Sequence, residues 1–82
     1  MRIFLEVTTP GNGKTYELVV DDKMTVGMAK GKIAEEIRAF ENDCIDFDEN
    51  AYLFSPVLRS RLPDSRNLRK AGVKSGQQVF LV

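Results

Sequence analysis

The sequence contains no histidine and no tryptophan, and its single cysteine is Cys44. Without histidine, the most frequent general base and metal ligand of enzymes is missing. Cys44 has no imidazole to deprotonate it, and acidic neighbours such as Asp43 and Asp46 suppress the reactive thiolate. A lone cysteine also forms no internal disulfide, which suits a reducing compartment. We therefore expect an inert thiol, no catalytic residues and no enzymatic activity.

Net charge and long apolar runs are lacking as well. Twelve basic residues balance twelve acidic ones, so no electrostatic argument favours nucleic acid or an anionic membrane as a partner. No stretch approaches the roughly 20 apolar residues that cross a bilayer. The first ten residues are too short and too alternating for a signal peptide. With 43% apolar residues in 82, the sequence predicts one globular domain over residues 1–82. Because neither a signal peptide nor a membrane span is recognisable, we expect this domain in the cytoplasm.

Two segments near the N-terminus alternate between apolar and polar residues. Met1–Val7 and Thr15–Val20 both show the period of two that is typical of half-buried strands. Between them, Pro10–Gly13 supplies the residue types that tight turns require. The pattern predicts an antiparallel hairpin.

A helical period follows this hairpin. Thr25 is a suitable N-cap, and apolar residues recur at helical spacing from Val26 to Phe40. Gly27 and Gly31 lie inside this segment, and each costs about 1 kcal/mol relative to alanine. The predicted helix, Val26–Phe40, therefore depends on packing against a sheet, and the small glycines permit a close approach to it.

Shorter elements complete the chain. We expect an acidic loop at Glu41–Asn50, strands at Ala51–Ser55 and Gln78–Val82, a short strand near Leu62 and a helical turn at Leu68–Val73. One helix over one face of a mixed four- to five-stranded sheet is an α+β domain of two layers. The residues expected in its core are Ile3, Leu5, Leu18, Val20, Val26, Ile33, Leu68, Val79 and Leu81.

Two apparent ligand motifs fail at their constrained positions. Asp46–Asn50 resembles the start of a calcium loop, but Ala51 stands where the sharp turn needs glycine and Val57 where a bidentate glutamate belongs. Gly13–Thr15 reads Gly-Lys-Thr, but the first glycine of a phosphate-binding loop is missing and a strand follows. We expect no metal, nucleotide or other cofactor.

Several segments, taken in order along nearly the whole chain, resemble ubiquitin. Their collinear order implies the ubiquitin-like β-grasp fold, in the strand and helix order ββαβ(β)β. The segments are Met1–Leu5, Thr25–Val26, Lys30–Ile33, Leu53–Phe54, Leu62–Leu68 and Gly72–Val82.

The end of the sequence departs from ubiquitin. The sequence stops at Val82 in the last predicted strand, without the Gly-Gly tail that conjugation or sulfur transfer requires. The sequence is similar to the YukD/EsaB family in its length, in its missing tail and in the pattern Leu-x-x-x-Gly-Val-x-x-Gly at Leu68–Gly76. That resemblance implies a non-conjugated accessory protein of a Gram-positive type VII (WXG100/Esx) secretion system that binds a protein partner. Alternatives are a ubiquitin-like domain of a larger protein, and a conjugating modifier or sulfur carrier whose tail is absent here.

The outer face of the sheet, away from the helix, is the candidate binding surface. In ubiquitin, the corresponding face carries the main recognition surface. Alternation and the resemblance predict a contiguous apolar patch there, with Arg59 or Arg61 at its rim. Other interpretations are scattered exposed residues, or a patch covered by the Pro56–Leu58 loop. The expected patch consists of Phe4, Leu53, Phe80 and Val82.

Overall fold

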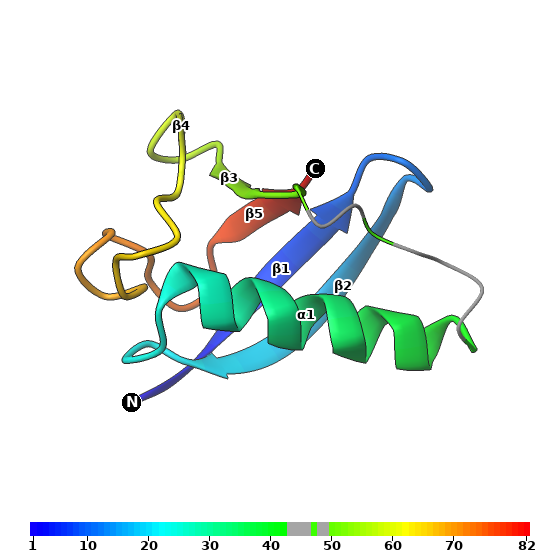
Figure 1. Cartoon of the computed structure of the whole chain (residues 1–82), viewed down its shortest axis with the longest axis horizontal. Coiled ribbons are helices and arrows are strands. Elements are labelled where there is room, and N and C mark those ends of the chain that lie inside the picture. Colours follow the sequence, from blue (N-terminus) through cyan, green and yellow to red (C-terminus); the bar gives the residue numbers. More distant parts are fainter. Residues whose placement is uncertain (43–46, 48–49) are drawn as a thin grey trace.

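The computed structural model describes residues 1–42, 47 and 50–82. Its five strands form one sheet in the order β2-β1-β5-β3-β4, and a single helix covers one face (Figure 1). Only β1 and β5 run parallel to each other, so the sheet is mixed. The predicted α+β class and two-layer architecture are confirmed. The elements are β1 (Arg2–Thr9), β2 (Lys14–Asp21), α1 (Val26–Phe40), β3 (Leu53–Ser55), β4 (Ser60–Arg61) and β5 (Gln78–Leu81).

The hairpin of β1 and β2 is closed by a turn built as its residue types predict. The backbone N–H groups of Asn12 and Gly13 donate to the carbonyl oxygen of Thr9, at 3.2 and 2.9 Å. Gly13 has a φ of 70°, a value that a residue without a β-carbon adopts at little cost. The Asn12 side chain accepts the backbone N–H of Lys14 at 3.0 Å. These bonds set the register in which Thr9 faces Lys14.

Helix α1 has the bounds that the sequence predicts, and the Thr25 hydroxyl caps it by accepting the N–H of Met28 at 3.2 Å. Its first turn docks on the chain near Asp64, because Gly27 N–H donates to Asp64 O at 3.1 Å. A β-carbon on Gly27 would lie 3.4 Å from that oxygen, whereas one on Gly31 would meet nothing within 4 Å. The expected close approach of both glycines to the sheet is therefore wrong: Gly27 approaches the loop after β4.

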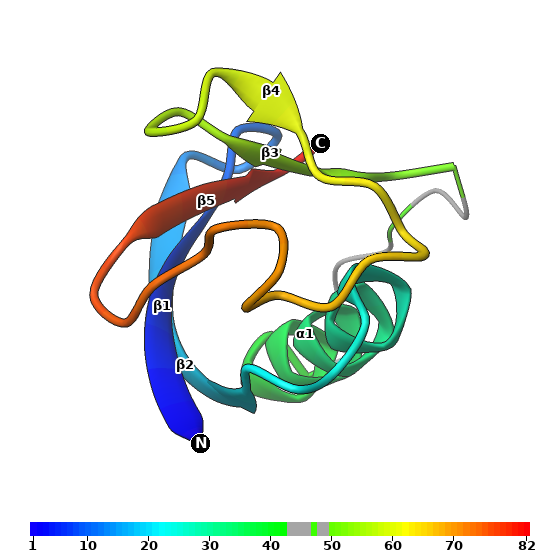
Figure 2. The same cartoon turned by 90° about the vertical axis from the view of Figure 1, so that its left-hand side faces the viewer.

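The core lies between α1 and the sheet, which curves around the helix (Figure 2). All nine predicted core residues are buried. Phe40, the last apolar residue in the helical period, is 66% exposed and stacks on Tyr16 near the turn of the hairpin. Further residues complete the buried apolar cluster: Val7, Ala29, Ile37, Leu53, Leu62 and Val73.

The segment between β4 and β5 closes one side of this core. Leu68 is buried, and its N–H donates to Met24 O at 3.0 Å, which ties the segment to the start of α1. The helical turn expected at Leu68–Val73 is a series of hydrogen-bonded turns that ends with Gly72 at a φ of 90°. Within the residues that the structure describes, no helix has the length and apolar character needed to cross a membrane.

Candidate functional site

Two phenylalanines from neighbouring strands stack on the outer face of the sheet. Phe54 on β3 pairs directly with Phe80 on β5, and the ring centroids are 6.4 Å apart with the planes inclined by 13°. The flanking residues, Leu53 and Leu81, are buried against the helix side. Because side chains alternate along a strand, both phenylalanine rings face away from α1.

Neighbouring residues extend the outer surface beyond this pair, both along β3 and β5 and across to β4. Tyr52 and Val82 lie opposite each other and exchange two backbone hydrogen bonds, at 2.7 and 3.0 Å. The Arg61 guanidinium lies 4.5 Å from the centre of the Tyr52 ring, a cation–π contact. Alternation places these three side chains on the same face as the phenylalanines. We call this group the aromatic surface: Tyr52, Phe54, Arg61, Phe80 and Val82.

A tight loop holds Arg61 at this position. Ser55 at the end of β3 is buried, and its hydroxyl accepts the N–H of Leu58 at 3.2 Å. The chain reverses with Arg59 at a φ of 55° and then pairs Arg61 with Phe54. Arg61 thus forms part of the aromatic surface, over Tyr52 and beside Phe54. Arg59, the other predicted rim residue, is exposed in the loop.

The predicted position of Leu53 on the outer face is wrong. Its side chain is 0% exposed, and it pairs with Leu81 on the core side of the sheet. A shift of one residue in a strand moves every side chain to the other face. Phe54 therefore occupies the outer position that the comparison with ubiquitin suggested for Leu53.

Phe4 also lies outside the aromatic surface. It is 51% exposed on the outer face, but its cross-strand partner is Val19 on β2. The parallel register pairs Thr8 with Phe80, so Phe80 lies four residues further along β1 than Phe4. At about 3.3 Å per residue, this separation is roughly 13 Å. The expected contiguous patch is thus divided into the aromatic surface and a smaller spot formed by Phe4 and Val19.

The Pro56–Leu58 loop leaves part of the outer face open. The Leu58 side chain lies against Gly72, 3.5 Å from the position of a β-carbon there. Val82 is 44% exposed, and Phe4 is exposed as well. The alternative in which this loop covers the whole predicted patch is therefore wrong.

A polar network joins the hairpin to the end of α1. Tyr16 donates a 2.6 Å hydrogen bond to Glu41, and Lys14 Nζ lies 3.1 Å from both carboxylate oxygens. The bond from Tyr16, followed by that from Lys14, lowers the pKa of Glu41 below its ordinary value. The hydrogen bond to Glu41 raises the pKa of Lys14. Every partner in this network is satisfied, so it stabilises the structure and offers no free acid or base.

The expectations about Cys44 and the calcium-like segment concern residues outside the described part of the chain, namely 43–46 and 48–49. In residues 1–42, 47 and 50–82, no group of three or more acidic or cysteine side chains is arranged to hold a metal ion. Sequence reasoning missed Tyr52 and Phe54 as residues of the outer face. The available signal was their spacing, two aromatic residues two positions apart, but β3 has only three residues and is too short for alternation to be recognised.

Comparison with known proteins identifies the fold. No protein-family model matches the sequence, and no curated protein matches it. Solved structures do match over the whole chain. The ubiquitin-like domain of Dsk2 from Plasmodium falciparum has a TM-score of 0.78 and 24% identity, covering 100% of this chain and 97% of that one.

Two further solved structures come from other organisms. The EccD5 ubiquitin-like domain from Mycobacterium xenopi has a TM-score of 0.78 and 12% identity, covering 100% of this chain and 93% of that one. A ubiquitin-like domain of the Arabidopsis thaliana protein At2g32350 has a TM-score of 0.71 and 23% identity, covering 99% and 76%. With its strand order, single helix and these likenesses, the chain has the ubiquitin-like β-grasp fold.

Proposed function

We propose that this chain is a non-catalytic module that binds a protein partner through the aromatic surface. The observation that carries this proposal is the stacked pair of Phe54 and Phe80 on the face of the sheet away from the core. Clusters of aromatic side chains on a solvent-facing sheet are typical of interaction sites.

The composition of the aromatic surface also fits an interface. Tyrosine and arginine are enriched among the residues that contribute most to binding energy, and phenylalanine is enriched in interfaces. The contact of Arg61 with the Tyr52 ring at 4.5 Å orients its guanidinium on this face before a partner binds. The phenylalanines would anchor the partner, and Arg61 and Arg59 would orient an approaching acidic surface.

More specifically, we propose a cytoplasmic accessory role in a type VII secretion system of Gram-positive bacteria, similar to that of the YukD family. Support comes from the resemblance at Leu68–Gly76 and from the likeness to EccD5, a ubiquitin-like domain of such a system. The alternatives are a domain of a larger protein and a modifier or sulfur carrier. The full reading frame distinguishes them, because a modifier or carrier needs Gly-Gly after the last strand.

Site-specific photocrosslinking in the source organism tests this function. The photoreactive p-benzoylphenylalanine replaces Phe80 in one strain and Glu35, exposed on α1, in a control strain. We expect a covalent adduct with a type VII secretion component from position 80, and its loss when Phe54→Ala is added. An adduct with a protein of another system would contradict the secretion role. Equal adducts from both positions, or none from position 80, would contradict the binding surface.

A further inference from the structure

One end of the molecule carries an excess of positive charge. Residues 59–74 contain six of the twelve basic residues of the chain but a single acidic residue, Asp64. All six are exposed, and Figure 2 looks onto the end of the molecule where the β3–β4 loop and the segment before β5 lie. The balanced total charge therefore hides a local excess of five positive charges, six minus one. The six residues are Arg59, Arg61, Arg66, Arg69, Lys70 and Lys74.

A contact between two separate segments builds this end. The Leu58 side chain of the β3–β4 loop lies against the turn before β5, 3.5 Å from the position of a β-carbon on Gly72. Hydrogen bonds fix that turn. Asn67 Oδ1 accepts the N–H of Lys70 at 2.7 Å. Gly72 N–H donates to Arg69 O at 3.1 Å. The backbone that carries Arg69 and Lys70 is therefore held next to the β3–β4 loop.

Acidic groups beside this end already face a positive group. Asp64 Oδ2 lies 3.2 Å from Lys30 Nζ. The Asp22 carbonyl oxygen accepts a backbone N–H of the turn at 3.0 Å, and the Asp22 carboxylate lies 3.1 Å from the Met1 amino group. The same amino group lies 3.3 Å from the carboxylate of Asp21. Within the described part of the chain, none of the six basic side chains forms an ion pair, so their charges are open to a ligand.

Exposed aliphatic side chains accompany these charges. Val57 and Leu58, in the β3–β4 loop, are 58% and 40% exposed. A site for single-stranded nucleic acid stacks bases on aromatic side chains and gains little from aliphatic ones. An apolar centre with a polar rim is typical of protein interfaces. We call this group the basic end: Val57, Leu58, Arg59, Arg66, Arg69 and Lys70.

We infer that the basic end binds an acidic segment of another protein. Carboxylates of that segment would pair with Arg69 and Lys70, and an aliphatic side chain between them would lie against Val57 and Leu58. The basic end shares no residue with the aromatic surface. The inference therefore goes beyond the proposed function and does not depend on it.

The charge of the rest of the chain selects a short acidic segment over an extended polyanion. Because the net charge is zero, the residues outside 59–74 carry eleven acidic residues against six basic ones. A long nucleic acid or an anionic bilayer extends beyond the basic end and meets this opposing charge. A few carboxylates presented by a protein contact the basic end alone.

The test is a titration of the ¹⁵N-labelled protein with synthetic peptides, followed by NMR. The probe is a blocked hexapeptide with two leucines between two pairs of glutamates, and a matched probe carries lysines in place of the glutamates. We expect the glutamate probe to shift the amide signals of Leu58, Arg69 and Lys70, and the lysine probe to bind at least about tenfold more weakly. Raising sodium chloride from about 50 mM to about 500 mM should weaken binding of the glutamate probe about fivefold, because salt screens exposed charges.

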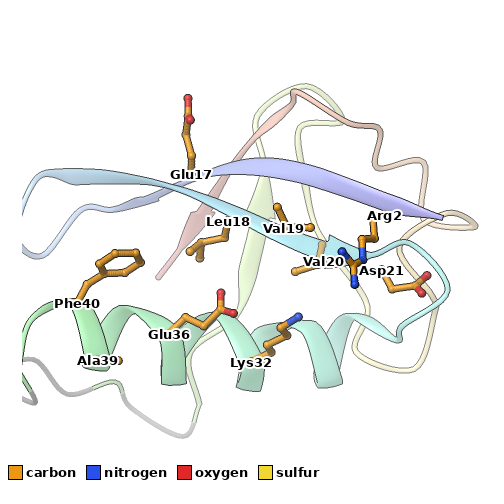
Figure 3. Close-up of a pocket in the computed structure, with 10 residues that line it drawn as sticks. All are labelled: Arg2, Glu17, Leu18, Val19, Val20, Asp21, Lys32, Glu36, Ala39 and Phe40. Carbon is orange, nitrogen blue, oxygen red and sulfur yellow. The ribbon is translucent and has the colours of Figure 1, made fainter.

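Charge-reversal variants identify the residues responsible. Lys70→Glu should weaken binding of the glutamate probe about threefold, because an exposed ion pair contributes little by itself. Combining it with Arg69→Glu should weaken binding about tenfold. The matched control is Lys32→Glu, which makes the same charge change beside the groove between α1 and β2 (Figure 3) and should bind like the parent. Thermal melting and the NMR spectrum of each variant show that it is folded.

Several results would overturn this inference. Equal binding of the glutamate and lysine probes is one, and undiminished binding by the folded double variant is another. An equal loss with Lys32→Glu would show a general charge effect. Shifts confined to the signals of Phe54 and Phe80 would assign the probe to the aromatic surface. Concentration-dependent shifts at Leu58 and Lys70 without any probe would assign the basic end to a second copy.

Two further arms address other anions. Tighter binding of a single-stranded oligonucleotide, or of vesicles that contain phosphatidylglycerol, would assign the basic end to that polyanion and contradict an acidic protein segment. No shift at millimolar glutamate probe would exclude the basic end as a binding site.

Discussion

Phe54 and Phe80 face each other across β3 and β5, with their rings nearly parallel and 6.4 Å between centroids. The pair has two consequences. Cross-strand aromatic pairs contribute to sheet stability, and this one ties the short strand β3 to the end of the sheet. The same rings form the centre of the surface that we propose for partner binding.

The first prediction compares neighbouring residues of β3. Leu53→Ala should lower the free energy of unfolding by about 2–5 kcal/mol, because it leaves a cavity in the core. Phe54→Ala should lower it by less, about 1–2 kcal/mol, since the half-buried ring loses its stacking partner and only part of a full side-chain burial. Urea denaturation of both variants measures the difference. If Phe54→Ala is the more damaging change, our assignment of the two faces is inverted.

A second prediction uses the two glycines of α1. Gly31→Ala should raise the free energy of unfolding by about 0.5–1 kcal/mol, because alanine favours the helix and its β-carbon meets open space. Gly27→Ala is the matched control. Its β-carbon would lie 3.4 Å from Asp64 O, at the short limit of ordinary van der Waals contact, so we expect a smaller gain there than at Gly31. Equal stabilisation by both changes, measured by urea denaturation, would show that Asp64 is not close to Gly27 in solution.

The third prediction concerns acid stability. The pKa of Glu41 lies below its ordinary 4.5 in the folded state, because Tyr16 and Lys14 hydrogen-bond to the carboxylate. Its contribution to stability is therefore complete above that ordinary value and is lost as the pH falls through the lower, folded-state pKa. Relative to Glu41→Gln, the parent should be more stable at pH 7, and this advantage should disappear toward pH 3.

Urea midpoints at several pH values measure this effect, with Glu35→Gln on the exposed face of α1 as the control. A difference between parent and Glu41→Gln that stays constant from pH 7 to pH 3 would show that the network with Tyr16 and Lys14 does not form.

Features set by local periodicity were predictable from the sequence. The bounds of α1 and the burial of Ile33 and Leu18 follow from repeating patterns that extend over several turns or residues of their elements. In contrast, β3 has three residues, too few for alternation to show which face Leu53 occupies. Its orientation is set by pairing with β5, a contact between distant parts of the chain.

The features of the site that could not be predicted from the sequence depend on how distant strands pair with one another. The separation of Phe4 from Phe80 depends on the parallel register of β1 and β5, and no local pattern encodes that register. The contact of Arg61 with Tyr52 depends on a two-residue strand closed by a tight loop.

The central claim is that the aromatic surface binds the partner. Its most direct test is isothermal titration calorimetry, in which the purified partner identified by photocrosslinking is titrated with the parent protein and with each variant, and the dissociation constants are compared. Phe80→Ala should weaken binding by at least about thirtyfold, since an aromatic anchor at the centre of an interface commonly contributes over 2 kcal/mol. Glu35→Ala on the exposed face of α1 should leave the affinity unchanged. If a folded Phe80→Ala variant binds like the parent while Glu35→Ala loses affinity, the helix and not the sheet carries the interface.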